Sequence, residues 1–117
     1  MLSRVHRALL LIACAIACRA QNVASIGGVV QDRSGAAIQQ ATIVVEDLET
    51  GVERRTATDG SGRYIVLSLP VGRYAVYVQK QNFQPIVRNG ITLVIGQQAA
   101  INFTLELGEL QQQVMVT

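Results

Sequence analysis

The chain has 117 residues, of which 50% are hydrophobic and 15% are charged, and its formal net charge is +2. This length suits one domain of ordinary size. The high apolar fraction and small net charge exclude a disordered acidic or basic tail, because such tails combine few apolar residues with a large net charge.

The N-terminal segment is predicted to be an export signal. Arg4 and Arg7 give it a basic start, Ala8–Cys18 is an unbroken apolar run of eleven residues, and small residues precede the polar continuation after Ala20. These are the three parts of a secretory signal peptide. A transmembrane helix needs about 20 apolar residues, so the run is too short to form one. We expect cleavage after Ala20, secretion across the inner membrane, and a product without a membrane span in the periplasm or at the outer membrane.

An alternative for the same segment is lipidation. Leu11–Cys14 and Ala15–Cys18 both resemble bacterial lipoprotein signals, in which the cysteine becomes the acylated first residue. Cys14 would leave a very short apolar run, and the motif at Cys18 has alanine where the pattern prefers leucine. Simple removal of the signal is therefore the preferred interpretation, and acylation at Cys18 stays open.

Cleavage changes which kinds of function the chain can support. Removing 20 of the 117 residues leaves 97, with seven basic and eight acidic residues and a net charge of −1. Nucleic-acid binding is not expected, because it requires a clustered basic face. Both cysteines and His6 are lost, which excludes Ser–His and Cys–His catalytic pairs and zinc sites that need His or Cys. We therefore predict a protein that is not an enzyme and carries no cofactor or metal.

The remaining acidic residues do not change this prediction. The carboxylates between Glu46 and Glu53 surround a predicted turn, where neighbouring acids are usually solvated. The sequence Asp59–Gly62 lacks the alternating oxygen ligands of a calcium loop.

Alternation with a period of two residues dominates the rest of the chain and predicts strands. The clearest case is Ile101–Leu107, where four apolar residues alternate with polar ones. The expected strands are Ser25–Gln31, Ala41–Glu46, Val52–Thr58, Arg63–Leu67, Tyr74–Val78, Ile86–Ile95 with a break at Asn89-Gly90, and Ile101–Leu107. We therefore expect an all-β protein of about seven strands.

Turn sequences separate these strands about every ten residues, a spacing typical of an antiparallel β-sandwich. Each turn supplies a residue that tolerates positive φ or a side chain that caps the turn. The residues expected to form this structural turn motif are Asp32, Gly35, Asp59, Gly62, Pro70 and Gly72.

Few residues suggest a binding site. Gly27-Gly28 lacks the lysine of a phosphate loop and fits a strand with close backbone approach. Arg54-Arg55 fits a charged edge strand. Tyr64 and Tyr74 are expected in the core, whereas Tyr77 points to the other face and is the candidate ligand contact.

Several motifs together resemble carboxypeptidase regulatory-like domains. They are Gly28–Ile38 with Ala41–Val45, Thr58–Tyr64 as T-D-x-x-G-x-Y, Leu69–Tyr74 as L-P-x-G-x-Y, and Gln81–Pro85, with Asn82 in place of the family's usual glycine. They occur in the family's order over most of the chain after the signal. The resemblance implies a seven-stranded prealbumin-like sandwich, related to the carbohydrate-binding-like fold.

The order of segments along the chain makes the resemblance more specific. A signal peptide (1–20), this sandwich (21–107) and Leu105–Thr117 are similar to the start of certain TonB-dependent outer-membrane receptors, with 108–117 as a linker toward a missing plug domain. We therefore expect an exported accessory domain of such a receptor, truncated here, whose partners are other domains or proteins of the cell envelope. The alternative is a periplasmic carbohydrate-binding sandwich, although the absence of tryptophan disfavours a sugar platform.

Overall fold

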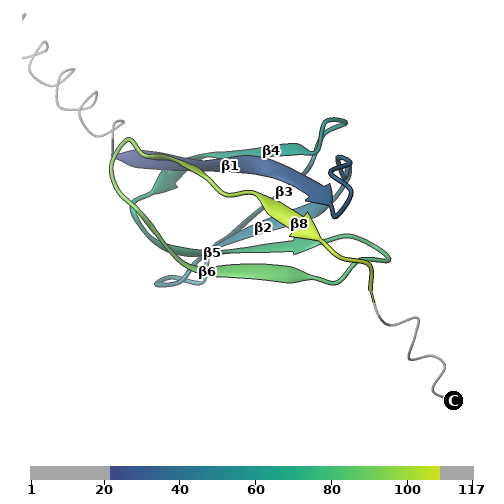
Figure 1. Ribbon diagram of the computed structural model, residues 1–117. Helices are drawn as coiled ribbons and strands as arrows, with labels where there is room; N and C mark the ends of the chain where they lie inside the picture. Colours follow the sequence, from purple (N-terminus) through teal and green to yellow (C-terminus); the bar gives the residue numbers. More distant parts are fainter. Residues whose placement is uncertain (1–21, 109–117) are drawn as a thin grey trace, which may run out of the picture.

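The computed structural model describes residues 22–108, so the predicted signal (1–20) and nearly all of the predicted linker (108–117) lie outside the described residues. The described part is all-β, as expected, and contains eight strands (Figure 1). They are β1 (Val23–Asp32), β2 (Thr42–Asp47), β3 (Glu53–Ala57), β4 (Arg63–Pro70), β5 (Gly72–Gln79), β6 (Ile86–Leu93), β7 (Gln98–Ala100) and β8 (Phe103–Leu105). No helix in residues 22–108 is long and apolar enough to cross a membrane.

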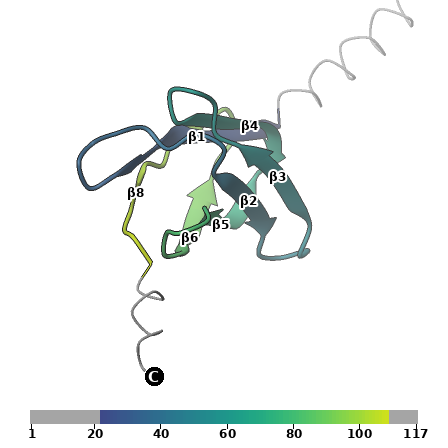
Figure 2. The same ribbon diagram turned by 90° about the vertical axis from the view of Figure 1, so that its right-hand side faces the viewer.

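The strands form two stacked layers (Figure 2). One sheet has the order β4-β1-β7, with β8 also pairing with β1, and the other has the order β3-β2-β5-β6. β1 begins at the end of the sandwich where β4 and β6 finish, here called the N-terminal end; β8 finishes at the opposite, C-terminal end (Figure 1). The predicted β-sandwich is therefore confirmed.

The core fills the space between the layers, because alternate residues of each strand point inward. Ile26 and Val30 of β1, Ile43 of β2 and Val76 of β5 are fully buried. Tyr74 is buried with them, which confirms its expected place in the core.

The last part of the fold differs from the predicted single strand Ile101–Leu107. The segment instead contains β8 and is preceded by β7, a short strand that the alternation did not reveal. Both strands run parallel to β1, with Ser25 opposite Gln98 and Val30 opposite Phe103. The described sandwich therefore has eight strands rather than seven, and its first sheet is mixed.

The break between β7 and β8 is explained by a contact with Gly28 of β1. A Cβ at this position would overlap the carbonyl oxygen of Ile101, so glycine allows that carbonyl to lie against β1. The Ile101 oxygen accepts a hydrogen bond from the Tyr64 hydroxyl at 2.6 Å. One residue later, the Asn102 side chain takes the place of a backbone carbonyl and accepts the Val29 N–H at 2.9 Å. The expected close backbone approach at Gly28 is thus present, and it interrupts the strand.

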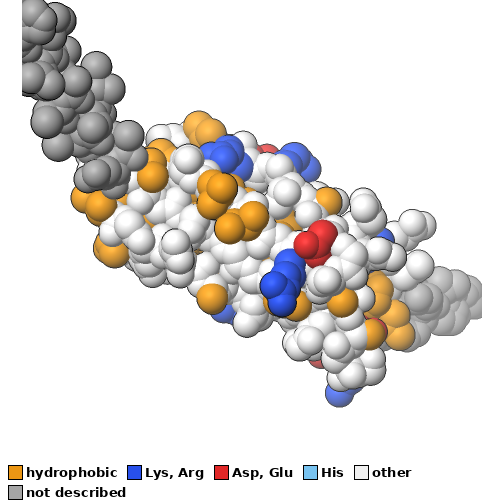
Figure 3. Space-filling view, turned by 90° about the horizontal axis from the view of Figure 1, so that it is seen from above, with side chains coloured by type: hydrophobic (Ala, Val, Ile, Leu, Met, Phe, Trp, Pro, Cys, Tyr) orange, Lys and Arg blue, Asp and Glu red, His pale blue; other side chains and the backbone are white. Residues whose placement is uncertain are grey.

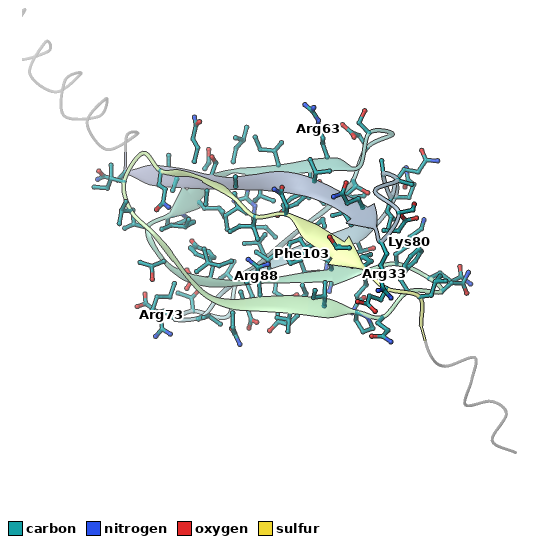
Figure 4. The ribbon with its side chains drawn as sticks, viewed as in Figure 1. Arg33, Arg63, Arg73, Lys80, Arg88 and Phe103 are labelled. Carbon is teal, nitrogen blue, oxygen red and sulfur yellow. The ribbon has the colours of Figure 1, made fainter. Side chains whose placement is uncertain are left out.

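On one side of the sandwich, β6 and β8 belong to different sheets, and Arg88 lies between them. Its guanidinium carbon is 5.4 Å from the centroid of the Phe103 ring, and Figure 4 shows the two side chains turned toward one another. A cation over a ring at this distance is attracted by the negative ring face. Asn89-Gly90 does not break β6 but forms an irregularity in its pairing with β5, with Gly90 at φ +70°.

Candidate functional site

The first predicted turn lies at the C-terminal end, after β1. Asp32 Oδ1 accepts hydrogen bonds from the Ser34 hydroxyl at 2.6 Å, the Ser34 N–H at 2.9 Å and the Ala36 N–H at 3.1 Å. The bonds from the Ser34 hydroxyl and from Ala36 hold the pKa of Asp32 below its usual value, because they favour the charged carboxylate. Gly35 has φ +90°. Asp32 and Gly35 therefore form a turn that is capped by its own aspartate.

The second predicted turn joins β3 to β4 at the same end. Asp59 Oδ1 accepts the N–H groups of Arg63 and Ser61, both at 2.9 Å, and these bonds lower the pKa of Asp59. Gly62 has φ +77°, and a Cβ there would lie 2.6 Å from the carbonyl oxygen of Val30. Gly62 thus combines a left-handed conformation with a close contact to β1, a position that only glycine suits.

Thr58 joins these turns, a role that the strand and turn patterns do not predict. Its hydroxyl donates to the Ile38 carbonyl at 2.7 Å and accepts the Ala41 N–H at 2.9 Å, and the side chain is buried. Val30 accepts the Ile38 N–H at 3.0 Å, which brings the loop after β1 against the second turn. The only earlier signal for Thr58 is its place beside Asp59 in the T-D-x-x-G motif.

The third predicted turn lies at the N-terminal end, away from the other two. Pro70 ends β4 and Gly72 begins β5, so Val71 alone separates the strands. The Tyr74 hydroxyl donates to the Pro70 carbonyl at 2.6 Å. The six motif residues therefore fall into two groups at opposite ends of the sandwich. The hydrogen bonds in both groups stabilise turns.

Tyr77, the candidate ligand contact, lies on the outer face of the second sheet. It pairs with Val44 of β2 and Val87 of β6, and its side chain is half-buried. Its hydroxyl donates to Glu46 Oε1 at 2.9 Å. That hydrogen bond raises the pKa of Tyr77, because ionising the phenol would place two negative charges together. The phenol is therefore oriented by Glu46 before any ligand arrives.

Next to Tyr77 the structure shows a polar groove that the sequence analysis missed. Its volume is about 510 Å³, and it runs from the outer pair Thr42 and Gln79 to the loop after β5. Side-chain amides, an ammonium group and one aromatic ring share its lining: Gln40, Thr42, Gln79, Lys80, Gln81, Phe83 and Pro85. The signal in the sequence is the alternation of Tyr77 with Gln79, which places a phenol and an amide on one face of β5. Gln81 lies in the turn after the strand. Amides donate and accept hydrogen bonds together, as the recognition of hydroxyl groups requires.

The charged residues considered earlier have structural partners. β3 is an edge strand, as expected for Arg54-Arg55. Arg54 donates to the Leu67 carbonyl in the other sheet at 2.8 Å, and Arg55 lies 3.5 Å from Glu53. Within residues 22–108, no three His, Cys, Asp or Glu side chains are grouped so that they could hold a metal ion.

Comparison with solved structures places this sandwich among known folds. It resembles the TIE protein of Bacillus anthracis (TM-score 0.63, 18% identity, 74% of this chain and 17% of that chain). It also resembles a putative carbohydrate-binding protein of Bacteroides uniformis (TM-score 0.56, 20% identity, 70% of this chain and 40% of that chain). A third similar structure is hydroxyquinol 1,2-dioxygenase of Pseudomonas putida (TM-score 0.59, 10% identity, 73% of this chain and 56% of that chain). These likenesses show a shared fold, and the chain spans less than two thirds of each of these proteins.

The fold and its turns define a two-sheet β-sandwich domain. The family profile of the carboxypeptidase regulatory-like domain matches residues 25–106. The chain therefore belongs to the carboxypeptidase regulatory-like domain family, which confirms the resemblance drawn from its motifs. No curated protein matches the chain in sequence.

Proposed function

We propose that this chain is a non-enzymatic, exported interaction domain of the bacterial cell envelope, the N-terminal module of a TonB-dependent outer-membrane receptor. The observation that carries the proposal is the way the domain holds its last described residues. Gln84 donates to the Glu106 carbonyl at 2.8 Å, and Gly108 donates to the Asn82 carbonyl at 2.9 Å. These bonds fix Gly108 at the C-terminal end, opposite the start of β1 (Figure 1). A module held this way suits a place in line between an export signal and a following domain.

The chemistry of the domain supports a role in binding rather than catalysis. After residue 20 the sequence contains no histidine or cysteine, the usual bases and nucleophiles of hydrolytic sites. Asp32 and Asp59 each accept backbone hydrogen bonds within their own turns. Tyr64 is buried, and burial raises its pKa to about 12, although the charge of Arg88 acts in the opposite sense. These groups stabilise the scaffold.

Export is tested by expressing residues 1–117 in a Gram-negative host and determining the N-terminus of the periplasmic product. We expect the product to begin at Gln21. The matched control is Leu10→Arg, which interrupts the apolar run and should leave the precursor in the cytoplasm. An intact precursor confined to the cytoplasm would contradict export, and acylation at Cys18 would appear as a membrane-bound product.

The receptor context is tested on the genome, by reading the DNA downstream of the Thr117 codon. We expect several hundred codons for a plug domain and a β-barrel to follow. Unrelated sequence after a clean stop would rule out the receptor and leave a free periplasmic sandwich.

The second candidate function is carbohydrate binding, and the polar groove beside Tyr77 favours it. A tyrosine ring can pack against the apolar face of a sugar, while Gln79 and Gln81 can bind its hydroxyl groups. The structural neighbour from Bacteroides uniformis is described as a putative carbohydrate-binding protein.

This candidate is tested by NMR titration of the ¹⁵N-labelled protein with xylohexaose and with maltohexaose. Shifts at Gln79 and Gln81 that disappear in Tyr77→Ala but remain in Tyr77→Phe would support it, because phenylalanine keeps the ring and loses only the bond to Glu46. The absence of any shift at millimolar sugar would rule out these ligands.

A further inference from the structure

Exposed aliphatic side chains gather at the N-terminal end of the sandwich. Nine large hydrophobic side chains are exposed in the described residues, and five of them lie in the loops of this end: Leu48, Val52, Val71, Val94 and Ile95. Val52 and Ile95 are each 61% exposed. The C-terminal end carries only Leu107 from this set of nine. Figure 3 shows hydrophobic side chains at the end at which β1 begins, and others in the middle of this face and at the opposite end.

Three separate loops bring these side chains together. The turn after β2 is bound to the start of β5, since Leu48 donates to the Arg73 carbonyl at 2.9 Å. The loop after β6 is bound to the start of β1, since Gly96 donates to the Val23 carbonyl at 2.9 Å. Val23 in turn pairs with Pro70, next to Val71. The loops that carry the five side chains are therefore neighbours at this end, and the five side chains are here called the apolar tip.

The charges near this apolar tip are balanced in sign. Asp47, Glu49 and Glu53 lie in or beside the turn after β2, while Arg54, Arg55 and Arg73 lie on the strands next to it. Arg54 is already bound to the Leu67 carbonyl. A surface that attracts anionic lipid or nucleic acid would carry a basic excess. The apolar tip instead suits a neutral, apolar surface.

The sequence indicates which surface lies nearby. The export segment joins the domain at this end, and its apolar run finishes at Cys18, four residues before Asn22. Four residues of fully extended chain span at most about 14 Å. Asn22 is therefore within about 14 Å of the end of the apolar run, and it lies at the same end of the sandwich as the apolar tip.

We propose that the apolar tip rests on the lipid surface while the uncleaved export segment, residues 8–18, holds the chain there. The proposal rests on the export segment of the proposed function. Burying the five aliphatic side chains in the lipid surface removes them from water, which favours this orientation over any in which the polar C-terminal end meets the membrane.

The chain contains no tryptophan, so a single introduced tryptophan reports its own surroundings. The uncleaved full chain carrying Ile95→Trp is bound to neutral phosphatidylcholine vesicles with brominated acyl chains, which quench tryptophan only at close range. The matched control is Val87→Trp, since Val87 is also exposed but lies on the outer face of the second sheet. Both variants are tethered by residues 8–18, so their difference reports orientation.

We expect at least twofold stronger quenching and a blue-shifted emission for Ile95→Trp, and loss of that quenching when Val52→Asp and Val71→Asp are added. Equal quenching at both positions, stronger quenching in Val87→Trp, or no vesicle binding would overturn the proposal. A blue shift of Ile95→Trp that grows with protein concentration without vesicles would show that a second copy covers the tip, and would also overturn it. Export itself is tested separately through the N-terminus of the periplasmic product, so the two failures are distinguishable.

Discussion

The two ends of this sandwich are built in different ways. At the C-terminal end, the turns of Asp32 and Asp59 are joined through Gly62 and the buried hydroxyl of Thr58. At the N-terminal end, Asp47 caps one turn in a similar way, but the loops carry exposed aliphatic side chains. The C-terminal end therefore holds more of the residues that fix the fold, and the N-terminal end more of those free to make contacts.

This difference explains why the sequence predicts the family of the domain but not its binding partners. Asp59, Gly62 and Thr58 belong to a motif because the backbone at that turn accepts few alternatives. Val52 and Ile95 meet no such constraint, because many side chains can occupy an exposed loop.

The largest effect is expected for Gly62→Val. The new side chain must adopt φ +77° and would collide with the Val30 carbonyl, so the free energy of unfolding should fall by about 3 kcal/mol or more. The matched control is Gly35→Val, where φ is +90° but no atom lies within 4 Å of the added Cβ. Urea denaturation should show a clearly smaller loss for Gly35→Val. Equal losses would mean that backbone conformation alone matters, and an unchanged melting temperature for Gly62→Val would refute the turn.

The next effect is expected for Thr58→Val. Valine has nearly the same shape but leaves the Ile38 carbonyl and the Ala41 N–H without their hydroxyl partner, which should cost about 2 kcal/mol. Thr92→Val, at an exposed position of β6, should change stability by less than about 0.5 kcal/mol. Both are measured by urea denaturation, and similar values for the two would show that the buried hydroxyl does not join the turns.

A smaller effect is expected from pH. Asp32 and Asp59 have pKa values below the usual 3.8 in the folded state, so they bind protons less readily there than in the unfolded chain. Their contribution is fully present above about pH 4 and is lost as the pH falls through the folded values. The urea concentration at the midpoint of denaturation should therefore decrease as the pH is lowered below about 4. The double variant with Asp32→Asn and Asp59→Asn should show a smaller decrease. Thr92→Val, which removes no titratable group, serves as the control and should leave the decrease unchanged. The same decrease in the double variant would contradict the assignment.

Much of the fold followed from local patterns, and the exceptions have non-local causes. The alternation predicts that Tyr74 faces the core, because the period of a strand fixes its faces. Val44 and Ala75 point to the opposite faces of their strands and are nevertheless buried. The break between β7 and β8 depends on Gly28 meeting Ile101, residues far apart in sequence. The parallel pairing with β1 likewise depends on where the chain returns, which no local pattern encodes.

The candidate site shows the same limit. Tyr77 was singled out because it is an aromatic residue on the face away from the core. The groove beside it is completed by Gln40, which the sequence places almost forty residues from Gln79. Only the antiparallel pairing of β2 with β5 brings these amides together.

The smallest effect on stability is expected at the apolar tip, and it sharpens the comparison between the ends. Val52→Asp and Ile95→Asp replace exposed side chains, so each should change the free energy of unfolding in solution by less than about 0.5 kcal/mol. Phe103→Ala, a buried position facing Arg88, is the control and should cost about 3 kcal/mol or more. Urea denaturation measures all three. Because the tip is expected to act only against a lipid surface, a large loss in Val52→Asp without lipid would assign these side chains to the fold rather than to contact.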